Sequence, residues 1–313
     1  MNRLPTTFIV LGLLFIIPLG CGPNDSEGLL TNNNGFKEVS NVDHRLFKLG
    51  KEATDQGLNL YVASTGETGV PIPLTDAANL SISVSGEILA KDSYSIIPIR
   101  SLSKELMSIS FVSDYSESMT NHNLSMIKNL YSQFSISTRG LAEAELITFA
   151  DIATVQQPFT SDSDKIISAL HNDATYQRGA TALYDGMGLA HQMLTAAGTN
   201  PIKIMIVSTD GLENVSTRYS KQQLVDNIAS SEAFVLMLGS FFANASDLEA
   251  IAGPNGAYIY SYSLKDAQLI ARRVMSSLHN SWVIQLDQKF KNKPININFN
   301  GKTITFNIGQ ESL

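Results

Sequence analysis

The chain has 313 residues with a formal net charge of −7, and 43% of its residues are hydrophobic against 16% charged, which is typical of a folded protein of about two domains. The acidic balance argues against nucleic-acid binding, because a nucleic-acid interface needs a basic face. One cysteine in the whole chain excludes an internal disulfide framework and a zinc site built from cysteines.

The first twenty residues have the pattern of an export signal. Arg3 precedes an almost wholly apolar run at residues 8–19, which is too short to span a bilayer because spanning takes about 20 residues. Cys21 follows at once. The segment resembles the lipobox of bacterial lipoproteins, in which the cysteine is acylated and becomes the mature N-terminus, although Pro18 stands where leucine is preferred. An ordinary secretory signal with an incidental cysteine is the alternative.

This resemblance implies a signal peptide at residues 1–20 and a lipid anchor on Cys21, which would hold the protein in the bacterial envelope, facing the periplasm or the cell surface. Acyl chains anchor a protein firmly because each buried CH₂ group contributes about 0.8 kcal/mol. Gly22 favours the outer membrane over the inner one, by resemblance to the sorting rule of enteric bacteria. Residues 21–50 are predicted to carry the lipid and to act as a flexible linker.

Short strands are expected on both sides of a central region. Alternating apolar and polar residues predict strands in residues 51–104 and again in residues 281–313, and Asn300-Gly301 is a strong hairpin signal. The predicted strands are Leu58–Val62, Leu80–Val84, Tyr94–Ile99, Trp282–Leu286, Ile295–Phe299 and Thr303–Ile308. We expect the two pieces to form one small β-sandwich domain into which the central region is inserted. Two separate β appendages are the alternative.

In the central region, residues 105–280, apolar strands alternate with helices. The predicted strands are Met107–Val112, Ala144–Phe149, Ile202–Val207 and Phe234–Leu238. The predicted helices are Ser125–Phe134, Leu183–Leu194 and Leu264–Leu278. Strands that are apolar throughout and alternate with helices predict an α/β fold, with a mostly parallel sheet covered by helices on both faces.

Polar residues that can bind a metal follow two of these strands. A D-x-S-x-S sequence formed by Asp114, Ser116 and Ser118 comes directly after the first strand. Thr181 precedes a predicted helix, and Asp210 follows the strand ending at residue 207. Because ligands of an open parallel sheet bind beyond the carboxyl ends of its strands, the two acids are expected to meet at one edge if their strands are neighbours.

In this order and at these positions, the three segments closely resemble the von Willebrand factor A (vWA) domain. The metal-ion-dependent adhesion site (MIDAS) of that family consists of D-x-S-x-S, then a threonine, then an aspartate. The resemblance covers about residues 107–280, and one departure is Ala180, where the family has a second glycine. It implies a vWA fold, Rossmann-like with a mostly parallel central sheet, combined here with the small β-sandwich.

The residue types agree with a site for a hard cation. Mg²⁺ prefers six oxygen ligands in an octahedral array, and Ser116, Ser118 and Thr181 can supply three neutral hydroxyl oxygens. Asp114 and Asp210 can supply negative charge directly or through water. The resemblance implies that one coordination position stays open for a carboxylate of a protein partner. The same donors admit Mn²⁺ or Ca²⁺.

The resemblance therefore implies an envelope-anchored binding or adhesion protein that uses a divalent metal to bind an Asp or Glu side chain of its partner. A structural or assembly factor of the cell envelope, in which the metal mainly stabilises the fold, is the alternative. No enzyme is expected, because the chain has no GxSxG elbow, no P-loop and no Rossmann glycine fingerprint.

Five residues beside the motif are candidates for shaping recognition, and we call them the rim residues: Tyr115, Glu117, Arg178, Glu213 and Asn214. Glu117 would repel an acidic partner and Arg178 would attract one, although each rim residue also fits a solvated loop. Asp185, one helical turn after Thr181, either orients the site or faces solvent. His191 lies in an apolar helix and is expected to be packed rather than a metal ligand.

Overall fold

The computed structural model describes residues 39–74, 79–172, 178–240, 243–261 and 264–308. The predicted signal peptide and Cys21 lie outside the described residues. Within the described ranges, no helix has both the length and the apolar character needed to cross a membrane.

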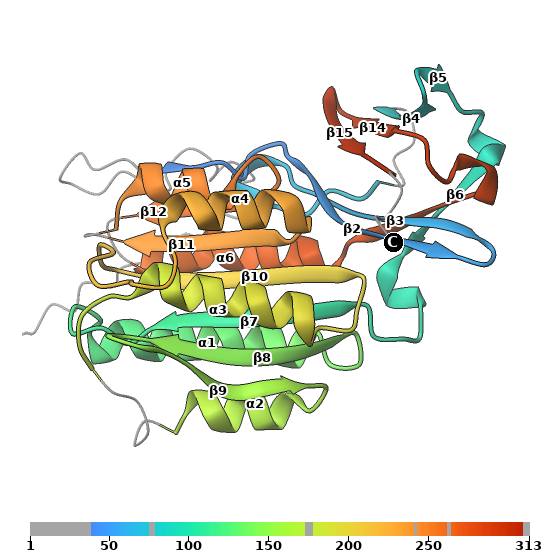
Figure 1. The fold of residues 1–313 in the computed structure, drawn as a ribbon. Helices are drawn as coiled ribbons and strands as arrows, with labels where there is room; N and C mark the ends of the chain where they lie inside the picture. The colour runs from blue at the N-terminus through green and yellow to red at the C-terminus, as the bar shows by residue number, and fades with distance from the viewer. Residues whose placement is uncertain (1–38, 75–78, 173–177, 241–242, 262–263, 309–313) are drawn as a thin grey trace, which may run out of the picture.

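The larger part of the molecule is built on a mostly parallel sheet (Figure 1). From one edge to the other, its strands are β9 (Ala153–Thr160), β8 (Ala142–Phe149), β7 (Met107–Asp114), β10 (Ile202–Thr209), β11 (Phe234–Ser240), β12 (Ala257–Ser261) and β1 (Val39–Ser40). The five strands from β8 to β12 are parallel, and the two edge strands pair antiparallel to their neighbours.

Helices cover both faces of this sheet, as Figure 1 shows. One face packs on α1 (Asn121–Ser137), α2 (Ser163–Leu170) and α6 (Leu264–His279). The other face packs on α3 (Leu183–Ala196), α4 (Lys221–Ser231) and α5 (Ala245–Ala252). Burial of the sheet on both faces explains why β10 and β11 are largely continuous apolar runs. In β7 and β8, serine and glutamate residues interrupt the apolar ones.

A smaller β unit lies beside the first one. One of its layers is the antiparallel run β2 (Leu46–Thr54), β3 (Gly57–Ser64), β13 (Trp282–Leu286) and β6 (Tyr94–Pro98). The other layer is a separate sheet of β15 (Lys302–Phe306), β14 (Ile295–Phe299), β4 (Leu80–Val84) and β5 (Glu87–Ile88). An apolar core between the layers contains Leu60, Ile82, Ile284 and Ile297, so segments from before and after the α/β unit share one core. Short 3₁₀ turns occur at Glu67–Gly69, Lys91–Ser93, Ile99–Ser101 and Gln288–Phe290.

The sheets of the two units are joined through one residue pair. Gly50 of β2 pairs with Ile202 at the beginning of β10, which makes the first layer of the β unit continuous with the large sheet. A Cβ atom at position 50 would clash with the carbonyl oxygen of Pro201, so glycine is required for this close approach.

The predicted fold class is confirmed, since the structure has a parallel central sheet with helices on both faces and a separate small antiparallel sheet. The Asn300-Gly301 turn is also found, with φ values of 49° and 76° that suit the hairpin between β14 and β15. The domain boundaries drawn from the sequence remain a prediction.

One buried acid makes stability depend on pH. Glu145 of β8 is fully buried, and neither carboxylate oxygen has a hydrogen-bond partner among the described residues. Burial raises the pKa of Glu145 to about 8, an interaction with Ser110 opposes this, and the nearby Glu143 adds to it. The folded protein therefore keeps a proton that the unfolded chain releases above the ordinary pKa of 4.5, so stability falls as pH rises toward 8.

We predict that Glu145→Gln removes this fall. Relative to wild type, the variant should gain about 1–3 kcal/mol of unfolding free energy between about pH 5 and pH 9. Urea unfolding at several pH values measures the difference, with Glu87→Gln on the exposed strand β5 as the control. Parallel stability curves for Glu145→Gln and wild type would contradict the prediction.

Candidate metal centre

The five predicted metal-binding residues meet at the carboxyl edge of the large sheet. Strands β7 and β10 are parallel neighbours, with Ser113 opposite Ser208. Asp114, the last residue of β7, and Asp210, which directly follows β10, therefore lie at the same edge. Thr181 comes two residues before α3, which begins at this edge as well. The arrangement is the one that the motif order predicted.

Helix α1 holds the two central strands together just below the site. The Tyr131 ring stacks on the Phe111 ring with centroids 4.7 Å apart. Its buried hydroxyl lies 3.1 Å from the Val112 carbonyl oxygen on β7 and 3.2 Å from the Ile206 carbonyl oxygen on β10, and donates to them. One side chain therefore fixes β7 and β10 relative to each other close to the strand ends that carry the acids.

Asp114 is completely buried and held by two donors. Its Oδ1 accepts from the Ser116 amide at 2.7 Å, and its Oδ2 accepts from the Thr209 hydroxyl at 2.6 Å. Burial raises the pKa of Asp114 to about 6; the hydrogen bonds from Ser116 and Thr209 oppose this effect, and the charge of Asp210 adds to it. A nearby cation would favour the ionised form and reverse this balance.

Asp210 has one oxygen that the described chain leaves unsatisfied. Its Oδ2 accepts from Nδ2 of Asn123, in the first turn of α1, at 3.1 Å. Its Oδ1 is buried and has no hydrogen-bond partner among the described residues. A buried acceptor without a donor is costly, and a bound cation or a metal-bound water would satisfy it. The residues present therefore fit a cation at this oxygen.

The three hydroxyl groups converge beside the acids. Ser116 Oγ and Ser118 Oγ are 2.9 Å apart. A Cβ atom at Gly211 would lie 3.1 Å from Thr181 Oγ1 and 3.2 Å from Ser118 Oγ, so both hydroxyls face the backbone at position 211. Ser116 and Thr181 are buried whereas Ser118 is exposed, which opens the cluster to solvent on the Ser118 side.

Asn214 and Glu213 hold loops rather than pointing freely into solvent. The Thr181 amide donates to Asn214 Oδ1 at 2.9 Å, and the Asn214 amide donates to the Thr181 carbonyl at 3.1 Å. The Glu213 carboxylate accepts from the amides of Tyr184, Val215 and Ser216 and from the Ser216 hydroxyl. These two rim residues therefore fix the Thr181 loop against the loop that follows Asp210.

Arg178 ties the first motif segment to the second. Its guanidinium donates to the carbonyl oxygens of Glu117, at 3.3 Å, and Met119. The Glu117 amide in turn donates to the Gly179 carbonyl at 2.8 Å. Tyr115 is buried, with the Lys128 ammonium 5.9 Å from its ring centroid. Glu117 differs from the other four rim residues. Its charged side chain is exposed, and among the described residues it makes no hydrogen bond to the backbone.

Asp185 orients the site indirectly. Its buried carboxylate accepts three backbone hydrogen bonds, from the amides of Thr217, Arg218 and Tyr219, at 2.9–3.1 Å. The alternative that it faces solvent is excluded by this burial. His191 is half-buried in α3, where burial lowers its pKa and favours the neutral ring.

Two supporting residues were missed in the sequence. Thr209 and Asn123 each hold one of the two acids, Asp114 and Asp210 respectively. The role of Thr209 could have been predicted, because this hydroxyl residue directly precedes Asp210 and the end of β10 lies beside the end of β7, which carries Asp114. Asn123 had no such signal, since its reach to Asp210 depends on how α1 packs on the sheet.

The surroundings of the site are mixed in character. A cleft of about 560 Å³ adjoins it on the α1 side, and its lining includes Tyr115, Lys128, His171 and Arg178. Exposed apolar side chains lie on loops at the same sheet edge, namely Ile152, Leu212 and Val215. Among the described residues, no three His, Cys, Asp or Glu side chains gather into a cluster that could hold a metal, so the donor set here is one of hydroxyls with two acids.

Comparison with known proteins gave one family match and several solved structures. The model of the von Willebrand factor type A domain matches residues 108–273. A search of curated proteins found no match. Proximal thread matrix protein 1 from the mussel byssus, in a structure with a zinc-occupied MIDAS motif, is 19% identical over 62% of this chain and 50% of that chain, with a TM-score of 0.49. This chain thus spans half the length of the mussel protein.

Two further structures are bacterial. The conserved hypothetical protein BatB from Bacteroides thetaiotaomicron is 20% identical over 55% of this chain and 98% of that chain, with a TM-score of 0.45. The PilB minor pilin from Streptococcus sanguinis, as its D319A mutant, is 12% identical over 78% of this chain and 79% of that chain, also with a TM-score of 0.45.

We predict that Gly211→Ala weakens divalent-metal binding without removing a ligand. The new methyl group would crowd the Thr181 and Ser118 hydroxyls, which are 3.1 and 3.2 Å from the Cβ position. Overpacking costs about 1–3 kcal/mol, so we expect metal affinity to fall about tenfold in a calorimetric titration. The neighbouring change Leu212→Ala removes an exposed side chain and should leave metal affinity as in wild type. Equal affinities of Gly211→Ala and wild type would place the metal elsewhere.

Proposed function

Because this chain belongs to the von Willebrand factor type A domain family, we propose that it is a binding protein whose metal centre engages an acidic side chain of a protein partner. Domains of this family are commonly adhesion or interaction modules with a divalent-metal site. The observation that carries the proposal is the buried, unsatisfied Oδ1 of Asp210 beside a cluster of three hydroxyls.

The residues that would hold the metal are Ser116, Ser118 and Thr181 through their hydroxyl oxygens, and Asp114 and Asp210 directly or through water. A bound divalent cation supplies positive charge that attracts a carboxylate. Mg²⁺ suits these oxygen donors, and so do Mn²⁺ and Ca²⁺.

The chain positions these donors before any ligand arrives. The Ser116 amide and the Thr209 hydroxyl fix the orientation of the Asp114 carboxylate, and Asn123 fixes that of Asp210. Supporting hydrogen bonds of this kind orient the groups that contact a metal and contribute to its affinity. The site therefore needs little rearrangement to accept a cation.

The partner would approach from the side on which Ser118 is exposed. The exposed Glu117 next to it disfavours a second acid at that position, whereas the cleft bordered by Lys128, His171 and Arg178 favours acidic or polar groups on the α1 side. Leu212 offers an apolar contact on the opposite loop. A partner segment with one acid flanked by an apolar residue suits this surface.

We place the protein in the bacterial envelope, held by a lipid on Cys21. The export signal at residues 1–20 and the cysteine that ends it support this placement. Gly22 supports the outer membrane rather than the inner one, with the folded part facing the periplasm or the cell surface.

A structural role for the metal is the second candidate, and the burial of Asp114 and Asp210 supports it. Without a cation, Asp114 and Asp210 are two buried neighbouring carboxyl groups whose charges oppose each other. A metal would relieve this repulsion and stabilise the fold whether or not a partner binds. In that case the metal would serve assembly of the envelope rather than adhesion.

We predict that Asp114→Ala reduces Mg²⁺ and Mn²⁺ affinity by about 10- to 100-fold, because it removes an acid that the site needs for charge and orientation. Calorimetric titration of the chain from residue 22 onward measures this. Asp164→Asn is the control, since Asp164 is an exposed acid that pairs with Arg139 far from the site. Absence of metal binding by wild type would overturn the proposal.

The same variant separates the two roles. For adhesion, metal-dependent capture of an envelope partner is lost while the melting temperature without metal stays near that of wild type. For a structural metal, adding Mg²⁺ raises the melting temperature of wild type by several degrees, Asp114→Ala does not respond, and no metal-dependent partner is captured.

A further inference from the structure

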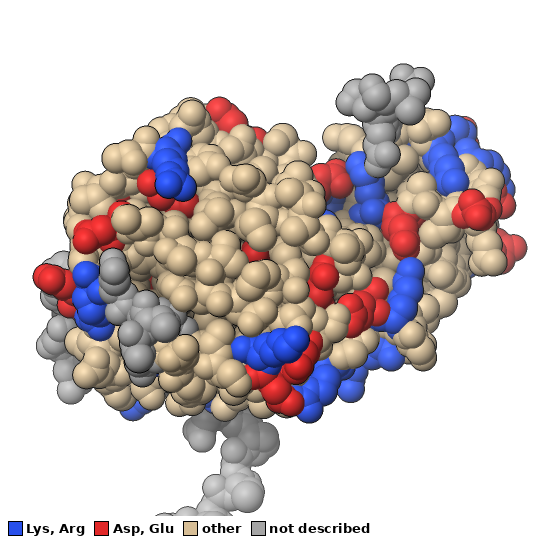
Figure 2. Space-filling model, turned by 60° about the horizontal axis from the view of Figure 1, so that its bottom comes forward, with Lys and Arg blue, Asp and Glu red and all other residues tan. Residues whose placement is uncertain are grey.

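A second polar cleft lies at the opposite end of the large sheet from the metal centre. It has a volume of about 420 Å³ and forms where the beginning of β10 meets β2 and the segment that leads into β14. Three lysines from these three places line it, namely Lys51, Lys203 and Lys291, and among the described residues Glu232 is the one acid in the lining. Figure 2 shows charged side chains of both signs gathered on the side of the smaller β unit, while much of the larger unit is uncharged.

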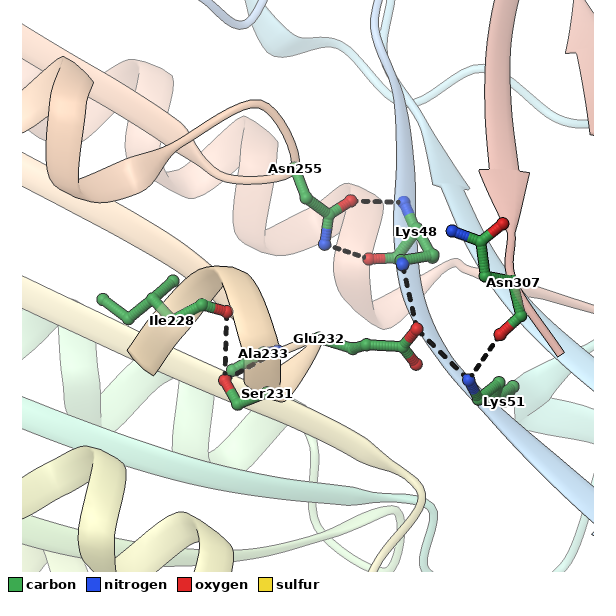
Figure 3. Close-up of polar contacts among 8 residues, drawn as sticks. All are labelled: Lys48, Lys51, Ile228, Ser231, Glu232, Ala233, Asn255 and Asn307. Atoms are coloured by element: carbon green, nitrogen blue, oxygen red, sulfur yellow. Dashed lines mark hydrogen bonds and ion pairs between the residues drawn. The ribbon is translucent and has the colours of Figure 1, made fainter. Parts of the chain in front are cut away.

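Glu232 is shared between two lysines and cannot neutralise the cleft. It ends α4 in the left-handed conformation, with a φ of 58°, which turns its side chain toward β2. Its Oε1 lies 3.1 Å from Lys48 Nζ and 3.3 Å from Lys51 Nζ, as Figure 3 shows. Asn255 fixes this part of β2 by bonding both the amide and the carbonyl of Lys48.

The other contacts of the lining lysines are to neutral carbonyl groups. Lys203 donates to the Gly198 carbonyl at 2.7 Å, Lys291 to the Thr54 carbonyl at 2.8 Å, and Lys51 to the Asn307 carbonyl at 2.9 Å. An ammonium group has three N–H donors, so Lys203 and Lys291 each use one of three within the described chain. Among the described residues, the cleft therefore has unused N–H donors and an excess of positive charge, although the net charge of the protein is −7.

Burial makes this excess charge costly. Lys203 and Lys291 are half-buried, and the side chain of Lys51 is 27% exposed. Burial lowers the pKa of Lys203, and Glu143, which lies on the sheet nearby, opposes that shift. Partly buried cations that outnumber the acids beside them are stabilised when an anion joins them.

We propose that this cleft binds a small multivalent oxyanion of the phosphate type, held by Lys51, Lys203 and Lys291. Lysine presents a compact point charge with three donors, which suits a tetrahedral oxyanion. The volume exceeds that of a bare phosphate and leaves room for a small organic group. Asn200 and Asn292 also line the cleft and supply amide groups for that part of the ligand.

Such a ligand would connect the two units of the protein. Lys203 belongs to the α/β unit, whereas Lys51 and Lys291 belong to the β unit, and the sheets of these units meet through one residue pair. An oxyanion in contact with all three lysines would stabilise their relative placement. This site is independent of the metal centre and of the function proposed for it.

The test is calorimetric titration of inorganic pyrophosphate and phosphate into the protein at constant ionic strength, with chelator present to exclude metal. We expect saturable binding that weakens about tenfold in Lys203→Met and in Lys291→Met, since each removes a charge-assisted contact. Glu232→Gln should bind several-fold more tightly, because it removes an acid from the lining of the cleft. Weaker binding by the two lysine variants together with tighter binding by Glu232→Gln is the pattern expected if the anion binds in this cleft.

Lys221→Met is the matched control, because Lys221 is a surface lysine that pairs with Asp247 elsewhere. Asp114→Ala should bind pyrophosphate as wild type does, which keeps this test separate from that of the metal centre. The proposal is overturned if wild type does not bind, if Lys221→Met loses as much affinity as the cleft variants, or if citrate binds as tightly as pyrophosphate. If Lys203→Met does not fold, Lys291→Met and Glu232→Gln decide.

Discussion

The parallel pairing of β7 with β10 is the constraint on which the candidate site depends. Ser113 lies opposite Ser208, so Asp114, one residue further along, and Asp210, two residues further along, lie at one sheet edge, where their charges repel. Two sets of hydrogen bonds offset this repulsion. Tyr131 of α1 holds the two strands together, and Thr209 and Asn123 each donate to one of the acids. Among the described residues Asp210 Oδ1 has no hydrogen-bond partner, and this is the observation from which we propose a cation at the site.

Around this pair, most polar side chains hold the backbone in place. Asp185 and Glu213 each accept several amide hydrogen bonds, Asn214 pairs with the backbone of Thr181, and Arg178 reaches the carbonyls of the D-x-S-x-S loop. These bonds connect three loops that come from distant parts of the chain. The hydroxyls of the site are therefore oriented by a network that spans several loops. A change in any of these supporting residues would alter the affinity for the proposed metal without removing a ligand.

The sequence predicted the apolar strands and the motif residues because both depend on strong local signals. Strands buried on both faces are continuous apolar runs, and Asp114, Thr181 and Asp210 follow a recognisable order. Weaker signals were missed. Strand β9 is a half-buried edge that contains Gln156, Gln157 and Pro158, and α4 buries little beyond Leu224 and Ile228, so neither has a clear hydrophobic period. The roles of Arg178 and Asn214 depend on contacts between loops 30 to 60 residues apart, which no local pattern encodes.

The short strand β1 is the part of the large sheet that tension on the preceding chain would reach first. It pairs with β12 through two residue pairs, Val39 with Tyr260 and Ser40 with Ile259. Arg45 also donates to the Pro254 carbonyl in the turn before β12, and Asn41 Oδ1 accepts from the Tyr258 amide of β12. Tension applied to the chain ahead of Val39 would reach these few bonds before it reached the central strands. These bonds would break before those of the core, because an edge held by few contacts opens at a lower free energy than the central strands. The edge of the sheet would thus yield first under tension, while the strands that carry Asp114 and Asp210 keep their pairing.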